Sequence, residues 1–129
     1  MKLTDNFSMY EFECKCGCKM PEYVKINIIE LANNLQYLRD YLKVPIHLTN
    51  SYRCKVHNKN VGGVKNSQHI KGKAADLKVD DVLPESLAAE ISFLMFNNCF
   101  KKGGIGIYNT FTHVDIRGYF ARWNKTNKK

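Results

Sequence analysis

Three residues in the second half of the chain are of types that can bind a metal ion together. His69 and Asp76 stand seven residues apart in SQHIKGKAADL, and His113 follows in THVDIRG. Imidazole nitrogen and carboxylate oxygen are zinc ligands, and a catalytic site uses three of them and leaves a fourth position for water. Bound zinc lowers the pKa of that water to about 7, which makes a nucleophile at neutral pH. Spacing alone supports this set only weakly, because a lone histidine more often has a structural role.

The expected strands collect polar side chains on one face, because side chains alternate along a strand. In AADLKV, Asp76 lies opposite the apolar positions, and in THVDIRG His113, Asp115 and Arg117 share one face. In HLTNSYR the alternate positions end on Arg53, and in GGIGIY two glycines leave room for a ligand or another backbone. The predicted sheet has an apolar face for a core and a polar face for a site. A solvated antiparallel sheet shows the same alternation.

Apolar spacing and turn residues predict the elements that position these strands. Ser8 and Glu11 match a capping box, which predicts a short helix from Ser8. Residues 26–42 and a segment beginning at Pro84 have the spacing of a helix face. VPIHLTNSY, AADLKV, GGIGIY and THVDIRG predict strands, the last two joined by a hairpin-like connection, and residues 55–73 predict a long polar loop. The order predicts an α+β fold, a small mostly antiparallel sheet flanked by helices.

Length and composition set the broad class. A chain of 129 residues that is 44% hydrophobic is expected to form a single domain with its core in residues 7–123 and a basic tail at 124–129. We expect no membrane span and no signal peptide, because no apolar segment is long enough for either. We also expect a monomer. The net charge of +8 attracts polyanions without choosing among nucleic acid, membrane and cell wall. Trp123 has two interpretations, a substrate platform or a core cap, and a lone tryptophan near a C-terminus more often caps a core.

Short motifs run through nearly the whole chain. They are the opening FSMYEFECKCGC, then SYR ending at Arg53, Asn58, the glycine pair 62–63, SQHIKGKAADL, GGIGIY and HVDIRG. Together they closely resemble the zinc D-alanyl-D-alanine carboxypeptidase family of bacteria and phages. Its superfamily includes phage L-alanyl-D-glutamate endolysins and the hedgehog signalling domain. The pattern S-x-H-x-x-G-x-A-x-D with a later H-x-D is far more specific than a histidine pair.

The resemblance implies a hedgehog/DD-peptidase-like fold and zinc held by His69, Asp76 and His113. It also implies that Arg53 lies near the substrate, where its guanidinium stabilises an oxyanion or binds a carboxylate. Ser67 matches a position that contacts substrate in relatives. The implied function is a zinc peptidase, either carboxypeptidase or endopeptidase, that acts on peptidoglycan peptides. A phage lysin or virion-associated enzyme would explain the missing signal peptide, and no specific nucleic-acid partner is expected.

One position departs from the family pattern. Several relatives carry an acid three residues before the last zinc histidine as general base, and Thr110 stands there in this chain. The branch that this chain resembles most has H-x-D, so Asp115 is the candidate base and acid. Its alternative role is to orient a ligand histidine or to pair with Arg117 or Arg53. The missing acid favours a second function, a catalytically silent zinc-containing binding module. A third, a basic nucleic-acid-binding domain, would not need His69.

Four cysteines form a separate group. Cys14, Cys16 and Cys18 of CKCGC, together with Cys54, would make a structural zinc site, although CxCxC is tighter than the usual ligand spacing. A disulfide between Cys54 and one of the other three is an alternative outside the cytoplasm. The third alternative is that these cysteines are reduced thiols with no structural role. Cys99 is interpreted as a small buried hydrophobe.

Overall fold

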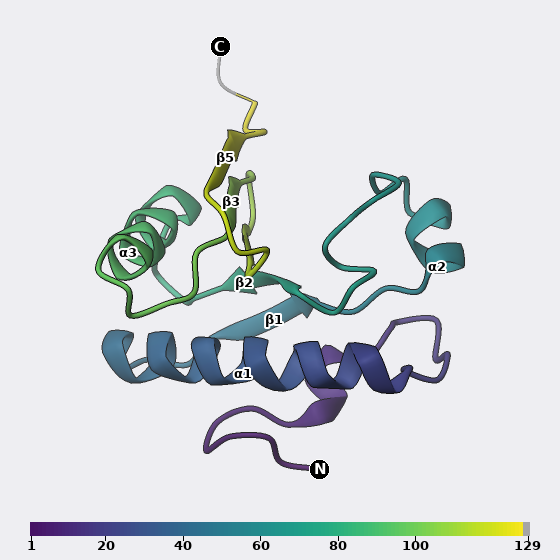
Figure 1. The fold of residues 1–129 in the computed structure, drawn as a ribbon. Coiled ribbons are helices and arrows are strands. Elements are labelled where there is room, and N and C mark those ends of the chain that lie inside the picture. Colours follow the sequence, from purple (N-terminus) through teal and green to yellow (C-terminus); the bar gives the residue numbers. More distant parts are fainter. Residues whose placement is uncertain (128–129) are drawn as a thin grey trace.

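A five-stranded sheet lies at the centre of the computed structural model, which describes residues 1–127 (Figure 1). The strands are β1 (His47–Asn50), β2 (Ala74–Lys78), β3 (Gly104–Ile107), β4 (Thr112–Asp115) and β5 (Ala121–Asn124). Their order is β1-β2-β4-β3-β5, and every neighbouring pair is antiparallel except β3 with β5. The α+β class with a mostly antiparallel sheet is therefore confirmed.

The helices surround this sheet. They are a short 3₁₀ helix, η1 (Met9–Phe12), and three α-helices, α1 (Glu22–Leu42), α2 (Lys55–Asn60) and α3 (Pro84–Phe96). η1 begins after Ser8, whose backbone N–H donates to the Glu11 carboxylate at 2.7 Å, as the capping pattern predicted. α1 ends at Leu42, and the capping residue Lys43 adopts a left-handed conformation (φ 61°) and donates its backbone N–H to the Arg39 carbonyl. Among the described helices, none has the length and apolar character needed to cross a membrane.

The apolar face of the sheet meets α1 and α3. Figure 1 shows α1 running along one side of the sheet, with the N-terminal segment on the far side of the helix. Leu77, Ile105 and Val114 from the sheet share one buried cluster with α1 and α3, whose members include Ile28, Leu31, Leu35, Leu38, Leu87, Ile91 and Met95. Because alternate strand residues face this cluster, the intervening residues are left for the opposite face.

Two elements were not predicted. α2 occupies the start of the segment interpreted as a loop; its residues KVHNKN are mainly polar and have no apolar spacing. β5 extends the sheet in parallel with β3, and the backbone N–H of Lys125 donates to the Ile107 carbonyl at 2.8 Å. Ordered pairing therefore continues beyond residue 123 into the expected tail. Residues 128–129 of that tail lie outside the described residues.

We expect Leu35→Ala to lower the free energy of unfolding by about 2–5 kcal/mol, because the truncation leaves a cavity in a closely packed core. Leu35 is fully buried in α1. Ile29→Ala on the same helix is the control, because Ile29 is 46% exposed, and it should cost much less. Urea unfolding of both variants measures the difference. Equal costs would show that α1 does not pack on the sheet in this orientation.

Candidate metal centre

The strand register aligns the polar residues in one row across the sheet. Asp76 of β2 is paired with Asn50 of β1 and with His113 of β4. His113 is paired in turn with Gly106 of β3, and Gly106 with Trp123 of β5. Paired residues on neighbouring strands project to the same face of a sheet. The row therefore gathers an acid, an imidazole and an indole on the face opposite the core.

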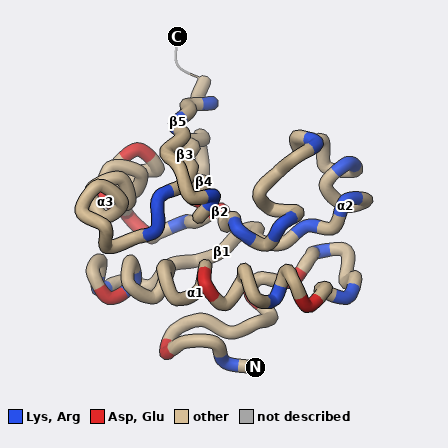
Figure 2. Tube along the Cα trace, viewed as in Figure 1, with Lys and Arg blue, Asp and Glu red and all other residues tan. Residues whose placement is uncertain are grey.

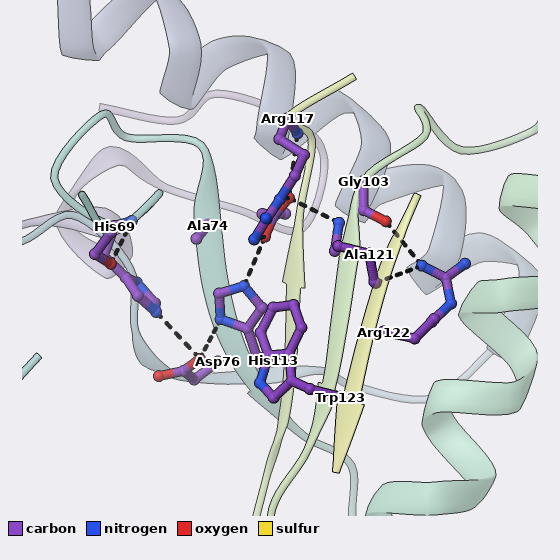
Figure 3. Close-up of polar contacts among 12 residues, drawn as sticks. His69, Ala74, Asp76, Gly103, His113, Arg117, Ala121, Arg122 and Trp123 are labelled. Atoms are coloured by element: carbon purple, nitrogen blue, oxygen red, sulfur yellow. Dashed lines mark hydrogen bonds and ion pairs between the residues drawn. The ribbon is translucent and has the colours of Figure 1, made fainter. Parts of the chain in front are cut away.

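The two histidines among the expected zinc ligands converge on one carboxylate oxygen of the third, Asp76. His69, from the loop before β2, places Nε2 at 3.3 Å from Asp76 Oδ1, and His113 places Nδ1 at 3.2 Å from the same oxygen (Figure 3). Tetrahedral zinc with bonds of about 2.0–2.2 Å would hold its donors about 3.3 Å apart. All three side chains are buried. The donor types and their spacing therefore fit zinc.

The remaining ring nitrogen of each histidine is hydrogen-bonded to a protein group on the side away from Asp76 Oδ1. His69 Nδ1 lies 2.7 Å from the Ser51 carbonyl oxygen, which only accepts, so Nδ1 carries the proton and Nε2 is left with its lone pair. His113 Nε2 lies 2.8 Å from Asp115 Oδ2, which leaves Nδ1 for the metal. Ligand histidines in metal sites are oriented by carbonyls and carboxylates in this way.

Asp115 is fully buried, and its oxygens are taken up by partners. Oδ1 accepts the Gly104 backbone N–H at 2.8 Å and Arg117 Nε at 2.9 Å. Oδ2 accepts Arg117 Nη2 at 2.7 Å in addition to the bond with His113. Asp115 is not among the residues that line the cleft described below. This geometry favours the orienting role over that of general base.

Hydrogen bonding outweighs burial in setting the charges of this network. Burial by itself raises the pKa of Asp76, but hydrogen bonds from His113 and His69 hold that pKa well below its usual range. The same competition holds the pKa of Asp115 low, through His113, Arg117 and the Gly104 N–H. Both carboxylates are therefore ionised at neutral pH, as a metal ligand and its supporting acid must be.

A cleft of 690 Å³ opens over the row. Tyr108 and Phe111 stack with ring centroids 4.4 Å apart on its wall, and the Trp123 ring lies 5.0 Å from that of His113. A Cβ on Gly106 would clash with Trp123 Nε1, so the indole itself fills the space that this glycine leaves. Of the two interpretations of Trp123, the core cap is wrong, because Trp123 lines the cleft, and the substrate platform stays a prediction. The alternation of apolar and polar residues in ARWN was the sequence signal that could have predicted β5.

The two expected substrate contacts line the same cleft. Arg53 donates its backbone N–H to the His69 carbonyl, and its side-chain Nε is buried without a hydrogen-bond partner among the described residues. Burial lowers the pKa of Arg53, and the nearby charge of Asp76 partly offsets this. Ser67 Oγ accepts the His69 backbone N–H at 3.1 Å, which leaves its hydroxyl proton for another partner. Thr110 lies exposed in the hairpin and does not line the cleft.

The charges around the cleft are mainly positive. Among the described residues, Asp76 is the only carboxylate in its lining, whereas Arg53, Arg117 and Lys125 also line it. Residues 41–75 contain six lysines and one arginine but no acid. Figure 2 shows this as blue segments without red over α2 and its neighbouring loop. The cleft should therefore attract anionic groups.

Comparison with known proteins identifies the family. The family model described as Peptidase M15 matches residues 5–115, which include all three metal-ligand candidates. The chain belongs to the peptidase M15 family. No curated protein matches it. Membership in this zinc-dependent family supports a metallopeptidase, in agreement with the donor set. β5 and Trp123 lie beyond the matched range, so the part of the cleft lining that Trp123 forms is not covered by the family match.

Replacement of Asp115 by Asn should lower zinc affinity by about 10–100-fold, the usual effect of losing a partner that orients a ligand histidine. The asparagine amide has only one oxygen, so it cannot accept all the hydrogen bonds that the two carboxylate oxygens of Asp115 accept from Arg117 and His113. Competition with a chromophoric chelator measures the affinity. Asp80→Asn is the control, since Asp80 lies on the surface near His47. Unchanged affinity in Asp115→Asn would contradict the orienting role.

Proposed function

We propose that this chain is a zinc metallopeptidase that hydrolyses peptide bonds in peptidoglycan stem peptides or cross-links. The observation that carries the proposal is the donor set of His69, Asp76 and His113, spaced for zinc on the floor of an open cleft. A structural site would be closed by a fourth protein ligand, whereas a catalytic site keeps one position free. Both a carboxypeptidase and an endopeptidase would use the same three ligands.

The chain's own residues hold the metal and orient its ligands. His69 Nε2, His113 Nδ1 and Asp76 would bind the zinc, with the rings fixed by the Ser51 carbonyl and Asp115. When bound, zinc supplies Lewis acidity and lowers the pKa of water to about 7. In this proposal Asp115 is a positioning residue, because its oxygens are already engaged by three partners.

Arg53 is proposed to act directly on the substrate. Its Nε is buried without a partner among the described residues, and its side chain lies on the cleft wall near Asp76. A guanidinium on the cleft wall beside the metal-ligand candidates is suited to the negative charge of a tetrahedral intermediate or to a substrate carboxylate. The free hydroxyl proton of Ser67 would donate to a substrate carbonyl from the same wall.

The cleft lining supports an anionic peptide as substrate. Peptidoglycan stem peptides carry free carboxylates, and among the described residues the cleft lining holds Arg53 and Lys125 beside a single acid, whereas Arg117 is paired with the buried Asp115. Tyr108, Phe111 and Trp123 add flat apolar walls that would hold short side chains. The net charge of +8 would also favour association with an anionic cell wall.

A second candidate function is a catalytically silent zinc-containing binding module on the same fold. The observation that favours it is the lack of a second carboxylate in the cleft lining among the described residues. Asp115 is buried, and Thr110 lies outside the cleft. Such a module would bind wall peptides without releasing products.

Zinc-loaded protein should release peptides from purified peptidoglycan, and a chelator or His69→Ala should abolish the release. Mass spectrometry of the soluble fraction across several wall chemotypes identifies the products and the bond. His47→Ala is the control, because His47 is an exposed histidine at the start of β1. Binding of wall fragments without release from any chemotype would reject the peptidase and support the silent module.

Arg53→Lys should lower kcat/KM for peptide release by about 100-fold while zinc content stays the same. The lysine keeps the charge but loses the planar fork of donors, and loss of one oxyanion donor costs about 10²–10³ in rate. Lys59→Ala, on the exposed side of α2, is the control for general loss of charge. Near-normal turnover in Arg53→Lys would exclude a specific contact with the reacting group.

A further inference from the structure

A second group of metal-binding side chains lies outside the cleft. Cys14, Cys16, Cys18 and Cys54 place their four sulfurs within 4.8 Å of one another. The Sγ–Sγ distances are 3.2 Å from Cys14 to Cys16, 3.6 Å from Cys16 to Cys54 and 3.9 Å from Cys14 to Cys54. All four are free thiols, and none lines the cleft.

We propose that these four cysteines bind a structural zinc ion that is separate from the catalytic centre. A tetrahedral zinc with Zn–S bonds of about 2.3 Å holds its sulfurs about 3.8 Å apart. The two distances to Cys54, 3.6 and 3.9 Å, are close to this value, and the Cys14–Cys16 distance of 3.2 Å is shorter. Four thiolates complete the coordination and leave no position for water, which is the mark of a structural site. The exposed Lys15 and Lys19 in the same loop partly offset the negative charge of the four thiolates.

The loop conformation explains how CxCxC, a spacing tighter than usual, brings its sulfurs together. Gly17 has a φ of +80°, and its N–H donates to the Cys14 carbonyl at 3.0 Å, which closes a tight turn within CKCGC. The fourth ligand candidate, Cys54, is distant in the sequence, and two backbone N–H groups near it donate to sulfurs of the cluster. The Cys54 N–H lies 3.5 Å from Cys14 Sγ, and the His57 N–H lies 3.4 Å from Cys54 Sγ. Such N–H···S bonds stabilise bound thiolates.

The cluster is joined to the catalytic cleft through one short segment. Cys54 directly follows Arg53, and Ser51 in the same segment holds the ring of the first ligand histidine through its carbonyl. The Tyr52 N–H donates to the last carbonyl of η1 at 3.0 Å, so the N-terminal region already borders this segment. A zinc ion at the cysteines would clamp the N-terminal loop onto residues 51–54. Its structural effect would be to fix the position of Arg53.

Metal analysis and cobalt spectroscopy of the reduced, full-length protein test this proposal. Wild type should bind two zinc ions per chain, and Cys16→Ser with Cys18→Ser should bind one and melt roughly 10 °C lower. Cobalt(II) added to metal-free wild type should give a strong thiolate-to-cobalt charge-transfer absorption in the near ultraviolet. Cys99→Ser is the matched control, because Cys99 lies outside the cluster, and it should keep both metals.

The outcomes separate this site from the catalytic one. His69→Ala should lose one zinc yet keep the thiolate–cobalt absorption, so failure of the peptidase proposal leaves the cysteine site intact. Wild type with a single zinc and no thiolate–cobalt absorption would overturn the proposal in favour of spare thiols. A mass two hydrogens lower with fewer titratable thiols would overturn it in favour of a disulfide. Because the cobalt measurement uses wild type, it does not depend on the variants folding.

Discussion

The pairing of Asp76 with His113 across β2 and β4 is the constraint on which the rest of the site depends. It sets an ionised carboxylate beside an imidazole on the face of the sheet that does not meet the core. One residue of slip between these strands would turn the acid into the apolar cluster around Leu77 and Val114 and remove the candidate ligand set. Tight burial on the core side therefore protects the register that the polar side needs.

Burying two carboxylates in one network is costly unless each is hydrogen-bonded. Asp76 is matched by two histidines, and Asp115 by His113, Arg117 and the Gly104 N–H. These bonds offset desolvation and also fix which nitrogen of each ring faces Asp76. The interactions that make the buried acids tolerable are the same ones that prepare the donors for a metal.

The segment of residues 51–54 connects the two potential metal sites. Its Ser51 carbonyl orients His69, its Arg53 side chain lines the cleft, and Cys54 joins the cluster with the N-terminal loop. A displacement at the cysteines would therefore reach the cleft through very few bonds. This short path gives a physical reason why a small peptidase domain would keep an N-terminal loop rich in cysteine.

Alternation along single strands determined much of the site from the sequence alone. It assigned Leu77 to the core and Asp76 and His113 to the opposite face, because side-chain direction in a strand is a local property with a period of two. The helix spacing and the capping residue at Ser8 were local in the same sense. Together with the motif resemblance, these patterns were enough to predict the fold class and the three candidate ligands.

Only the tertiary structure decided how distant side chains meet. Asp115 shares a face with His113 in the sequence pattern, but its burial against Arg117 is what withdraws it from the cleft. Trp123 reaches the cleft through the parallel pairing of β5, and Cys54 reaches the CKCGC loop across the fold. These contacts depend on long-range packing and strand register, which have no local period for the sequence to display.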